Sequence, residues 1–146
     1  RKADSFGATV VGARPFLIAY NFTLSSKLQL NDSKSIASLV RESIGDLKGV
    51  RAIGWWMEGY RRAQVSCNLT DTFSVSAKEL FDAVSAEAHR LGGTVEASEL
   101  IGLIPAHGLR GFAPLEDAVS YLKLDGHGAF DLKSRLLENL LNTLPS

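Results

Sequence analysis

Polar side chains alternate along one stretch of the sequence, where they could hold a small ligand by hydrogen bonds. Residues 63–71 read A-Q-V-S-C-N-L-T-D. Successive side chains of a strand point to opposite faces, so one face here is polar and the other apolar. The polar row consists of Gln64, Ser66, Asn68 and Thr70, and the apolar row of Ala63, Val65, Cys67 and Leu69. Because buried polar groups need partners, the polar row faces water, another polar surface or a ligand. A solvated outer face of an antiparallel sheet is the alternative that strand statistics favour.

The other reactive side chains form no second constellation suited to catalysis. The three histidines, His89, His107 and His127, have no Cys or His at metal-ligand spacing, and we expect no metal site. The single cysteine, Cys67, falls on the apolar row and is expected in the core. The sequence contains no P-loop, no dinucleotide fingerprint and no G-x-S-x-G motif.

Length and charge limit the classes of partner. The chain has 146 residues, which fits one domain. Its 16 Lys and Arg balance 16 Asp and Glu, so neither nucleic acid nor an anionic membrane is an expected partner. No signal peptide or membrane span is visible. Asn21 and Asn68 belong to glycosylation-type sequons but fall inside predicted strands, which suits a cytosolic protein better than a glycosylated one. We therefore expect a cytoplasmic protein.

The elements that must position the polar row follow an alternating order. β-Branched and aromatic runs predict four strands, at residues 16–24, 50–57, 63–71 and 94–104. Apolar residues at helical spacing predict one helix after the possible caps at 31–33, ended by Gly45, and another after the capping box at 76–79, ended by Gly92-Gly93. The order strand, helix, strand, strand, helix, strand is the split βαβ pattern. We predict an α+β, ferredoxin-like βαββαβ domain, an antiparallel sheet with two helices on one face.

The two ends of the chain are expected to lie outside this unit. Residues 1–12 are small and polar and read as a linker. Residues 106–146 read as a helical extension, with candidate helices at 116–124 and 132–141. The adjacent Trp55 and Trp56 must point to opposite faces of their strand, which places one in the core and leaves the other for the open face.

Several blocks of sequence resemble a known family. Residues 12–21 (G-A-R-P-F-L-I-A-Y-N) are similar to the start of the C-terminal subdomain of glutamate formiminotransferases. The segments I-G-W at 53–55, A-Q-V-S-C-N-L at 63–69 and S-E-L-I-G-L-I-P at 98–105 resemble the same subdomain, and F-D-L-K at 130–133 resembles its closing motif. The resemblance implies transfer of a formimino group from N-formiminoglutamate to tetrahydrofolate, in histidine breakdown. It also implies two subdomains that bracket a folate-binding tunnel, the C-terminal one being a ferredoxin-like unit.

The resemblance covers one wall of such a site. The family's general acid/base histidine lies in an N-terminal subdomain, and none of the three histidines of this chain falls in the matching blocks. We therefore expect the substrate-binding half of the enzyme, with no catalytic residue or metal ligand of its own and inactive alone. Its expected partners are tetrahydrofolate, glutamate-type small molecules and an N-terminal formiminotransferase subdomain in cis or trans. Its open face also suggests a homodimer. The alternative is a stand-alone, non-catalytic ferredoxin-like module that binds folate, another small ligand or a partner. The chain begins at Arg1 without an initiator Met, which is compatible with a piece of a longer protein.

Six residues are candidates for substrate or folate binding: Arg14, Asn21, Gln64, Ser66, Asn68 and Glu99. Arg14 could clamp a glutamate carboxylate, or only anchor its loop. Asn21 could extend the polar row, or only satisfy the end of its strand. Glu99 could take the charge of an amidinium group, or pair with a nearby basic residue. The polar row itself contains no group that titrates near neutrality.

Overall fold

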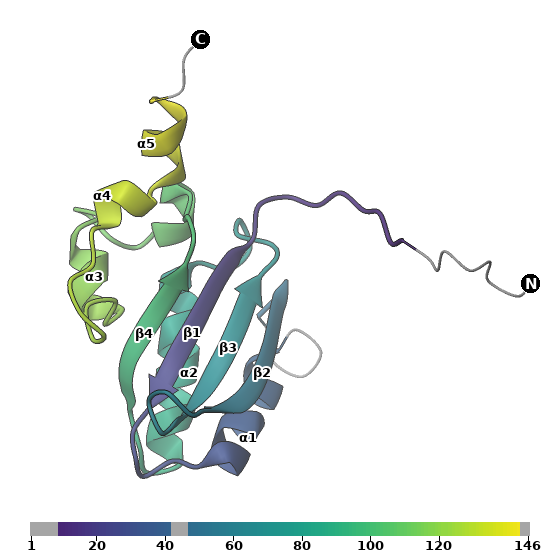
Figure 1. Ribbon diagram of the computed structural model, residues 1–146, viewed down its shortest axis with the longest axis vertical. Coiled ribbons are helices and arrows are strands. Elements are labelled where there is room, and N and C mark those ends of the chain that lie inside the picture. The colour runs from purple at the N-terminus through teal and green to yellow at the C-terminus, as the bar shows by residue number, and fades with distance from the viewer. Residues whose placement is uncertain (1–8, 42–46, 144–146) are drawn as a thin grey trace, which may run out of the picture.

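The computed structural model describes residues 9–41 and 47–143. Its four strands are β1 (Ile18–Leu24), β2 (Val50–Met57), β3 (Arg62–Leu69) and β4 (Val95–Ile101), and its two long helices are α1 (Leu30–Val40) and α2 (Ala77–Arg90). The sheet has the order β2-β3-β1-β4, and every neighbouring pair is antiparallel. Figure 1 shows α1 and α2 behind this sheet, with the other face open toward the viewer. The predicted α+β, ferredoxin-like fold is confirmed.

Alternation along the central strand β1 fixes which face of the sheet is the core. Ile18, Tyr20, Phe22 and Leu24 are buried at 1% exposure or less, and they pack in one cluster with apolar residues of α1 and α2. The intervening residues, Ala19, Asn21 and Thr23, therefore point to the opposite, open face. Burial of this apolar face on the two helices is the main source of stability of the domain.

Helix α2 begins as the sequence predicts. The Ser76 hydroxyl accepts a hydrogen bond from the backbone N–H of Glu79 at 3.2 Å, and the Glu79 carboxylate accepts from the backbone N–H of Ser76 at 2.8 Å. This reciprocal capping box satisfies two backbone donors that the helix leaves open. The pKa of Glu79 is lowered, chiefly by the backbone and side-chain hydrogen bonds from Ser76.

Several predicted boundaries shift by a few residues. β1 begins at Ile18 rather than at residue 16, and β4 ends at Ile101, where Gly102 adopts a positive φ of 80°. The N-cap of α1 is Gln29 rather than one of the expected caps at 31–33, because the Asp32 carboxylate accepts from the Gln29 backbone N–H at 2.7 Å. The helix ends at Val40, before the expected stop; Gly45 lies outside the described residues.

The C-terminal extension is part of the core rather than an appendage. It contains a 3₁₀ helix, η1 (Ala106–Leu109), and three short helices, α3 (Asp117–Tyr121), α4 (Leu132–Arg135) and α5 (Leu137–Leu141). Leu122, Leu124 and Leu132 are buried with the residues of the sheet, and the hydroxyls of Tyr20 and Ser98 both donate to the carbonyl of Leu122. In Figure 1 the extension lies beside β4, next to one edge of the sheet.

The predicted helix at 132–141 is broken into α4 and α5. Leu136 is extended, with φ −74° and ψ 123°, and it forms a parallel bridge with Ile104. The N–H of Ile104 donates to the carbonyl of Arg135 at 2.9 Å, and the N–H of Leu137 donates to the carbonyl of Ile104 at 3.0 Å. Pairing with the chain that leaves β4 therefore replaces one helical turn. Among the described residues, no helix is long and apolar enough to cross a membrane.

Candidate functional site

The predicted alternation of β3 is present in the structure. Cys67 faces the helices and is 1% exposed, whereas Ser66 is half-buried and Asn68 is exposed on the open face. Burial raises the pKa of the Cys67 thiol to about 12, so this residue is a neutral core side chain. Trp55 pairs with Gln64 across β2 and β3 and lies on the open face, while Trp56 packs against the core.

Three of the predicted binding residues lie side by side across the sheet. The antiparallel register places Asn21 opposite Ser66 on one side and opposite Glu99 on the other. Residues directly opposite on neighbouring strands have Cβ atoms about 4.5–5.5 Å apart, close enough to contact one ligand. We call Asn21, Ser66, Asn68 and Glu99 the polar strip. Apolar side chains flank the strip on the same face, with Ile53 63% exposed and Ile101 54% exposed.

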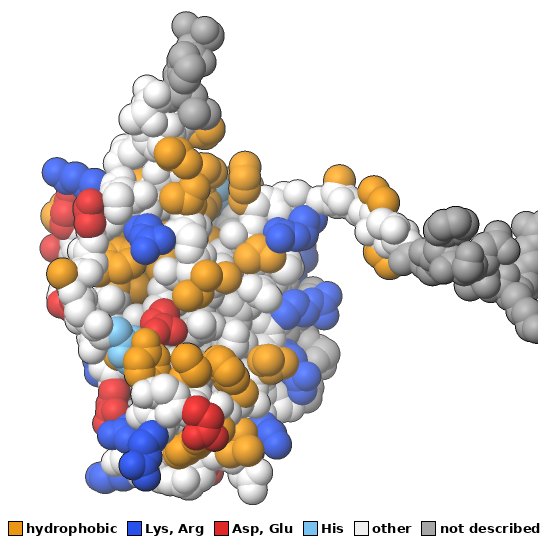
Figure 2. All heavy atoms as spheres, viewed as in Figure 1, with side chains coloured by type: hydrophobic (Ala, Val, Ile, Leu, Met, Phe, Trp, Pro, Cys, Tyr) orange, Lys and Arg blue, Asp and Glu red, His pale blue; other side chains and the backbone are white. Residues whose placement is uncertain are grey.

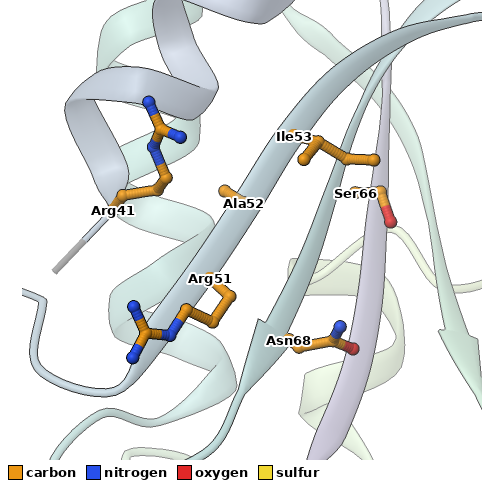
Figure 3. Close-up of a pocket in the computed structure, with 6 residues that line it drawn as sticks. All are labelled: Arg41, Arg51, Ala52, Ile53, Ser66 and Asn68. Carbon is orange, nitrogen blue, oxygen red and sulfur yellow. The ribbon is translucent and has the colours of Figure 1, made fainter. Parts of the chain in front are cut away.

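A cavity of about 360 Å³ adjoins the polar strip at the β2 edge of the sheet. Its lining consists of Arg41, Arg51, Ala52, Ile53, Ser66 and Asn68, which Figure 3 shows as sticks. Arg41 is the C-cap of α1, and its Nη2 donates to the Ser38 hydroxyl at 3.2 Å. Its Nε is buried without a hydrogen-bond partner among the described residues. Figure 2 shows further Lys and Arg side chains along this edge of the open face.

Neither Arg41 nor Arg51 was among the predicted site residues, although the sequence could have predicted the position of Arg51. The hairpin between β2 and β3 pairs Met57 with Arg62 and, at the other end, Arg51 with Asn68. Because β2 and β3 are joined by a short turn, their pairing can be counted back from that turn, and the count places Arg51 beside Asn68 of the polar row. Arg41 comes from a helix end, and only the packing of α1 on the sheet brings it near. Guanidinium groups with amide and hydroxyl neighbours are well suited to bind carboxylates.

Arg14 does not join the other candidates. It lies on the arm formed by residues 9–17, which leads away from the sheet in Figure 1. Its Nη1 donates to the carbonyl of the adjacent Pro15 at 3.2 Å, and its side chain is exposed. In the structure, this residue therefore contributes nothing to the polar strip.

Gln64 belongs to the open face by register, but it is fully buried. Its Nε2 donates to the Thr23 hydroxyl at 2.9 Å, and that hydroxyl lies 2.9 Å from Nε2 of His127. The extension therefore reaches over the open face at this end of the polar row. Gln64 Oε1 has no hydrogen-bond partner within the described part of the chain, and an unpaired buried acceptor is costly to the folded state.

Glu99 also has partners that sequence reasoning missed. Its Oε1 accepts a hydrogen bond from the Tyr60 hydroxyl at 2.6 Å and lies 4.0 Å from Nε2 of His127. The rings of Tyr60 and His127 stack, with centroids 4.2 Å apart and an interplanar angle of 9°. The hydrogen bond to the Glu99 carboxylate raises the pKa of Tyr60. Tyr60 sits in the β2–β3 turn and His127 in a glycine-flanked loop, so neither showed a pattern in the sequence.

The structure describes no group of three His, Cys, Asp or Glu side chains placed to hold a metal ion. What the open face offers is therefore hydrogen bonding and charge: amide and hydroxyl groups along the strip, guanidinium groups at the β2 edge, and a carboxylate with a neighbouring imidazole toward β4. Such a face can orient a polar, charged small molecule between an anion-binding end and a cation-binding end.

Comparison with known proteins assigns this domain to a family of transferases. Residues 19–128 match the family model of the formiminotransferase domain, and the chain belongs to this family. It is 36% identical to the formimidoyltransferase-cyclodeaminase of Mus musculus over 159 residues, covering 94% of this chain and 29% of the relative. It is 32% identical to the glutamate formimidoyltransferase of Thermoplasma acidophilum, covering 93% of this chain and 43% of the relative. It is 36% identical to the glutamate formimidoyltransferase of Streptococcus pyogenes serotype M1, covering 92% and 42%. The chain thus spans less than half the length of these relatives.

Proposed function

We propose that this chain is the substrate-binding half of a glutamate formimidoyltransferase, in which a formimino group passes from N-formiminoglutamate to tetrahydrofolate. The observation that carries the proposal is the arrangement of charges along the polar strip. A cavity lined by Arg41 and Arg51 adjoins one end of the strip, and Glu99 forms its other end. The names of the relatives, which are formimidoyltransferases, support the reaction class.

The charges on the two ends of the strip fit the two ends of the donor substrate. N-Formiminoglutamate carries carboxylates on its glutamate part and an amidinium group on its formimino part. The carboxylates would bind at the guanidinium groups of the β2 edge, because guanidinium groups form bidentate hydrogen bonds with carboxylates. The amidinium would lie toward Glu99, with Asn21 and Ser66 holding the substrate between the two ends. Fixed hydrogen bonds of this kind hold reacting groups in register.

The strip forms only one wall, and transfer needs a second. The attacking nitrogen of tetrahydrofolate must approach the amidine carbon, and water must be kept away from the reacting atoms. Because the polar strip lies on the open face of a single sheet, we infer that an N-terminal formiminotransferase subdomain covers it, in cis or in trans. Tetrahydrofolate then acts as co-substrate between the two walls.

The test is a formimino-transfer assay with the chain alone and with the chain mixed with the N-terminal subdomain of the Thermoplasma acidophilum relative. We expect turnover near the uncatalysed level for the chain alone and clear turnover in the mixture. Asn68→Ala should raise KM for N-formiminoglutamate about tenfold, the loss expected for a hydrogen bond to a charged group. The control Asn139→Ala, on α5, should change nothing. Binding of both substrates without transfer in any mixture would contradict the proposal.

A second function, that of a non-catalytic binding module, is favoured by one observation. Ile53, Trp55 and Ile101 are all exposed on the same face as the polar strip. Exposed apolar residues around a polar centre are typical of a surface that binds a partner. Two results together would favour this function: the chain binds the ligand, and no N-terminal subdomain tested gives turnover when mixed with it.

A further inference from the structure

Glu99 is a partly buried carboxylate that no Lys or Arg side chain neutralises in the described part of the chain. It lies on β4 at one end of the polar strip, and its side chain is only 22% exposed. Among the described residues its one ion-pair contact is with His127, whose Nε2 lies 4.0 Å from Oε1. Carboxylates taken out of water are normally paired with a cation. The position therefore favours a positive charge supplied by a ligand.

Two basic side chains from the surroundings of His127 are engaged elsewhere. Arg62 lines a cavity together with His127, but its Nε pairs with Oε2 of Glu96 at 3.2 Å. Lys123, directly after α3, donates to the carbonyl of Val95 at 2.6 Å. The side chain of Glu96 is 44% exposed. Of these two carboxylates on β4, the more buried one is thus the one without a guanidinium partner.

Neutral contacts hold the Glu99 carboxylate in place without offsetting its charge. The Tyr60 hydroxyl donates to Oε1 at 2.6 Å. The Tyr60 ring stacks on His127 with centroids 4.2 Å apart, and Nε2 of His127 lies 2.9 Å from the Thr23 hydroxyl. Oε2 of Glu99 has no hydrogen-bond partner among the residues that the structure describes. The carboxylate is therefore fixed through one oxygen and open at the other.

Asn21 gives this carboxylate a neutral neighbour on β1. The antiparallel register places Asn21 directly opposite Glu99, and its side chain makes no hydrogen bond to another described residue. A carboxylate oxygen and an amide oxygen side by side can accept two N–H groups of one planar cation. An amidinium group has this form, with an N–H on each of two nitrogens and one delocalised positive charge.

We propose that Glu99 makes the polar strip select a cationic amidinium group over the neutral formyl group of the same shape. This assignment rests on the proposed function and adds the residue that separates N-formimino from N-formyl amino acids. A formyl group carries a carbonyl oxygen where the amidinium carries an N–H group. That oxygen would face the lone pairs of Glu99, so the formyl compound loses a charged hydrogen bond and meets repulsion as well.

Glu96 provides a matched control on the same strand. It is a carboxylate three residues before Glu99, and its charge is already offset by Arg62. Glu96→Gln should therefore leave the selectivity unchanged. Glu99→Gln keeps the length of the side chain and an oxygen that accepts from Tyr60, but it removes the charge. It also adds an N–H group that can donate to a formyl oxygen.

The experiment compares the affinity of the chain for N-formiminoglutamate and for N-formylglutamate by NMR titration, at about pH 8, where imidazole side chains are ordinarily neutral. We expect wild type to bind the formimino compound about 10–100-fold more tightly. In Glu99→Gln the ratio should fall to about threefold or less, because the formimino compound binds more weakly and the formyl compound binds at least as well. Glu96→Gln should keep the wild-type ratio.

Formamidinium and formamide, which lack the glutamate part, test Glu99 separately from the proposed function. Formamidinium should shift the NMR signals of Asn21 and Tyr60 in wild type but not in Glu99→Gln, and formamide should not shift them in wild type. A wild-type ratio close to unity, a ratio that Glu99→Gln leaves unchanged, or formamidinium shifts that do not depend on Glu99 would overturn the assignment. If neither glutamate derivative binds, the proposed function is contradicted instead, and the formamidinium response decides the role of Glu99 by itself. Backbone amide signals of the sheet establish that each variant is folded.

Discussion

At the scale of single residues, the buried end of the polar row is a short hydrogen-bonded chain rather than a solvated surface. Gln64 donates to Thr23, and Thr23 contacts His127, a residue 104 positions away in sequence. The same contacts that fix the imidazole also connect the extension to the middle of the sheet. The position of the extension over the open face therefore depends on these three side chains.

Replacing Thr23 with Val should destabilise the domain. The change leaves Nε2 of the buried Gln64 without its acceptor and removes the contact to His127, and we expect a loss of about 1–3 kcal/mol in the free energy of unfolding. Thr70→Val is the control, because the Gly49 carbonyl that accepts from the Thr70 hydroxyl also accepts from its backbone N–H. It should cost less than about 1 kcal/mol. Urea unfolding measures both, and equal effects would contradict the expected role of Thr23.

The thiol of Cys67 should be unreactive in the folded protein. Burial raises its pKa to about 12, from 9.0, so the folded state keeps the proton where the unfolded state loses it. This contribution to stability is complete below pH 9 and is lost as the pH rises toward 12. Between pH 9 and 11, the free energy of unfolding should fall more steeply for wild type than for Cys67→Ala, by up to about 1.4 kcal/mol per pH unit. Rapid reaction with a thiol reagent at pH 8 in native buffer would contradict the burial.

The sequence predicted the residues of the polar strip because strand alternation is a local property. Ser66 and Asn68 follow from the period of two, and Asn21 and Glu99 lie in strands that the sequence also predicted. Arg41 and His127 could not be predicted in this way, since a helix end and a loop bring them in through tertiary packing. Arg14 was predicted as a binding residue, but it lies on the arm of residues 9–17, which leads away from the sheet.

At the scale of elements, close packing of α1 on β2 positions Arg41 over the edge of the sheet. Gly54 faces the helix, and a Cβ atom built there would come within 2.2 Å of the backbone nitrogen of Lys34. Real Cβ atoms do not approach backbone so closely, so this position needs glycine for space. Gly54 belongs to the block I-G-W at 53–55, which resembles the family. Close packing against α1 explains why this block has glycine at its centre.

Gly54→Ala should therefore push α1 away from the sheet. We expect a loss of at least about 1–3 kcal/mol in the free energy of unfolding, the usual cost of overpacking a core. Gly59→Ala is the matched control, since nothing lies within 4 Å of its Cβ position and its φ is not positive. It should be neutral or stabilising by less than about 1 kcal/mol. Thermal or urea unfolding compares the two, and a stable Gly54→Ala protein would show that α1 is displaced at little cost.

The order of the elements could be predicted from the sequence, whereas the C-terminal part could not. Apolar residues at helical spacing and the capping box at Ser76 predicted the two long helices, and β-branched and aromatic runs predicted the four strands. The helix expected at 132–141 breaks at Leu136 because the backbone there pairs with Ile104, more than 30 residues away. Local sequence propensity cannot predict such a long-range contact. It also cannot predict that Leu122 and Leu124 are buried in the core.

At the scale of the whole molecule, the open face combines a polar strip with exposed apolar residues. Ile53, Trp55 and Ile101 are 63%, 39% and 54% exposed, and Figure 2 shows apolar side chains spread across this face. The chain covers 29% to 43% of the length of the relatives compared above. The N-terminal subdomain proposed above would bind on this face.

Without such a partner, the chain should associate with itself. We expect sedimentation velocity to show a dimer at high protein concentration, formed through the open face or through the edge strands β2 and β4. Ile53→Lys should weaken a dimer formed through the open face. Phe73→Lys, at a residue that is 77% exposed in the loop before α2, is the control and should not. A monomer at all concentrations would contradict this expectation.

The most direct test of the central claim, that the open face is a ligand-binding wall, is to locate N-formiminoglutamate on the chain by NMR. Backbone and side-chain amide signals are followed as the ligand is added to the isotope-labelled protein. We predict that the largest changes fall on Asn21, Ser66, Asn68 and Glu99, and that they spread to Arg51 at the β2 edge. Residues of α2 on the opposite face should stay unchanged. Changes confined to the helices, or none at concentrations that saturate a formimidoyltransferase, would contradict the claim.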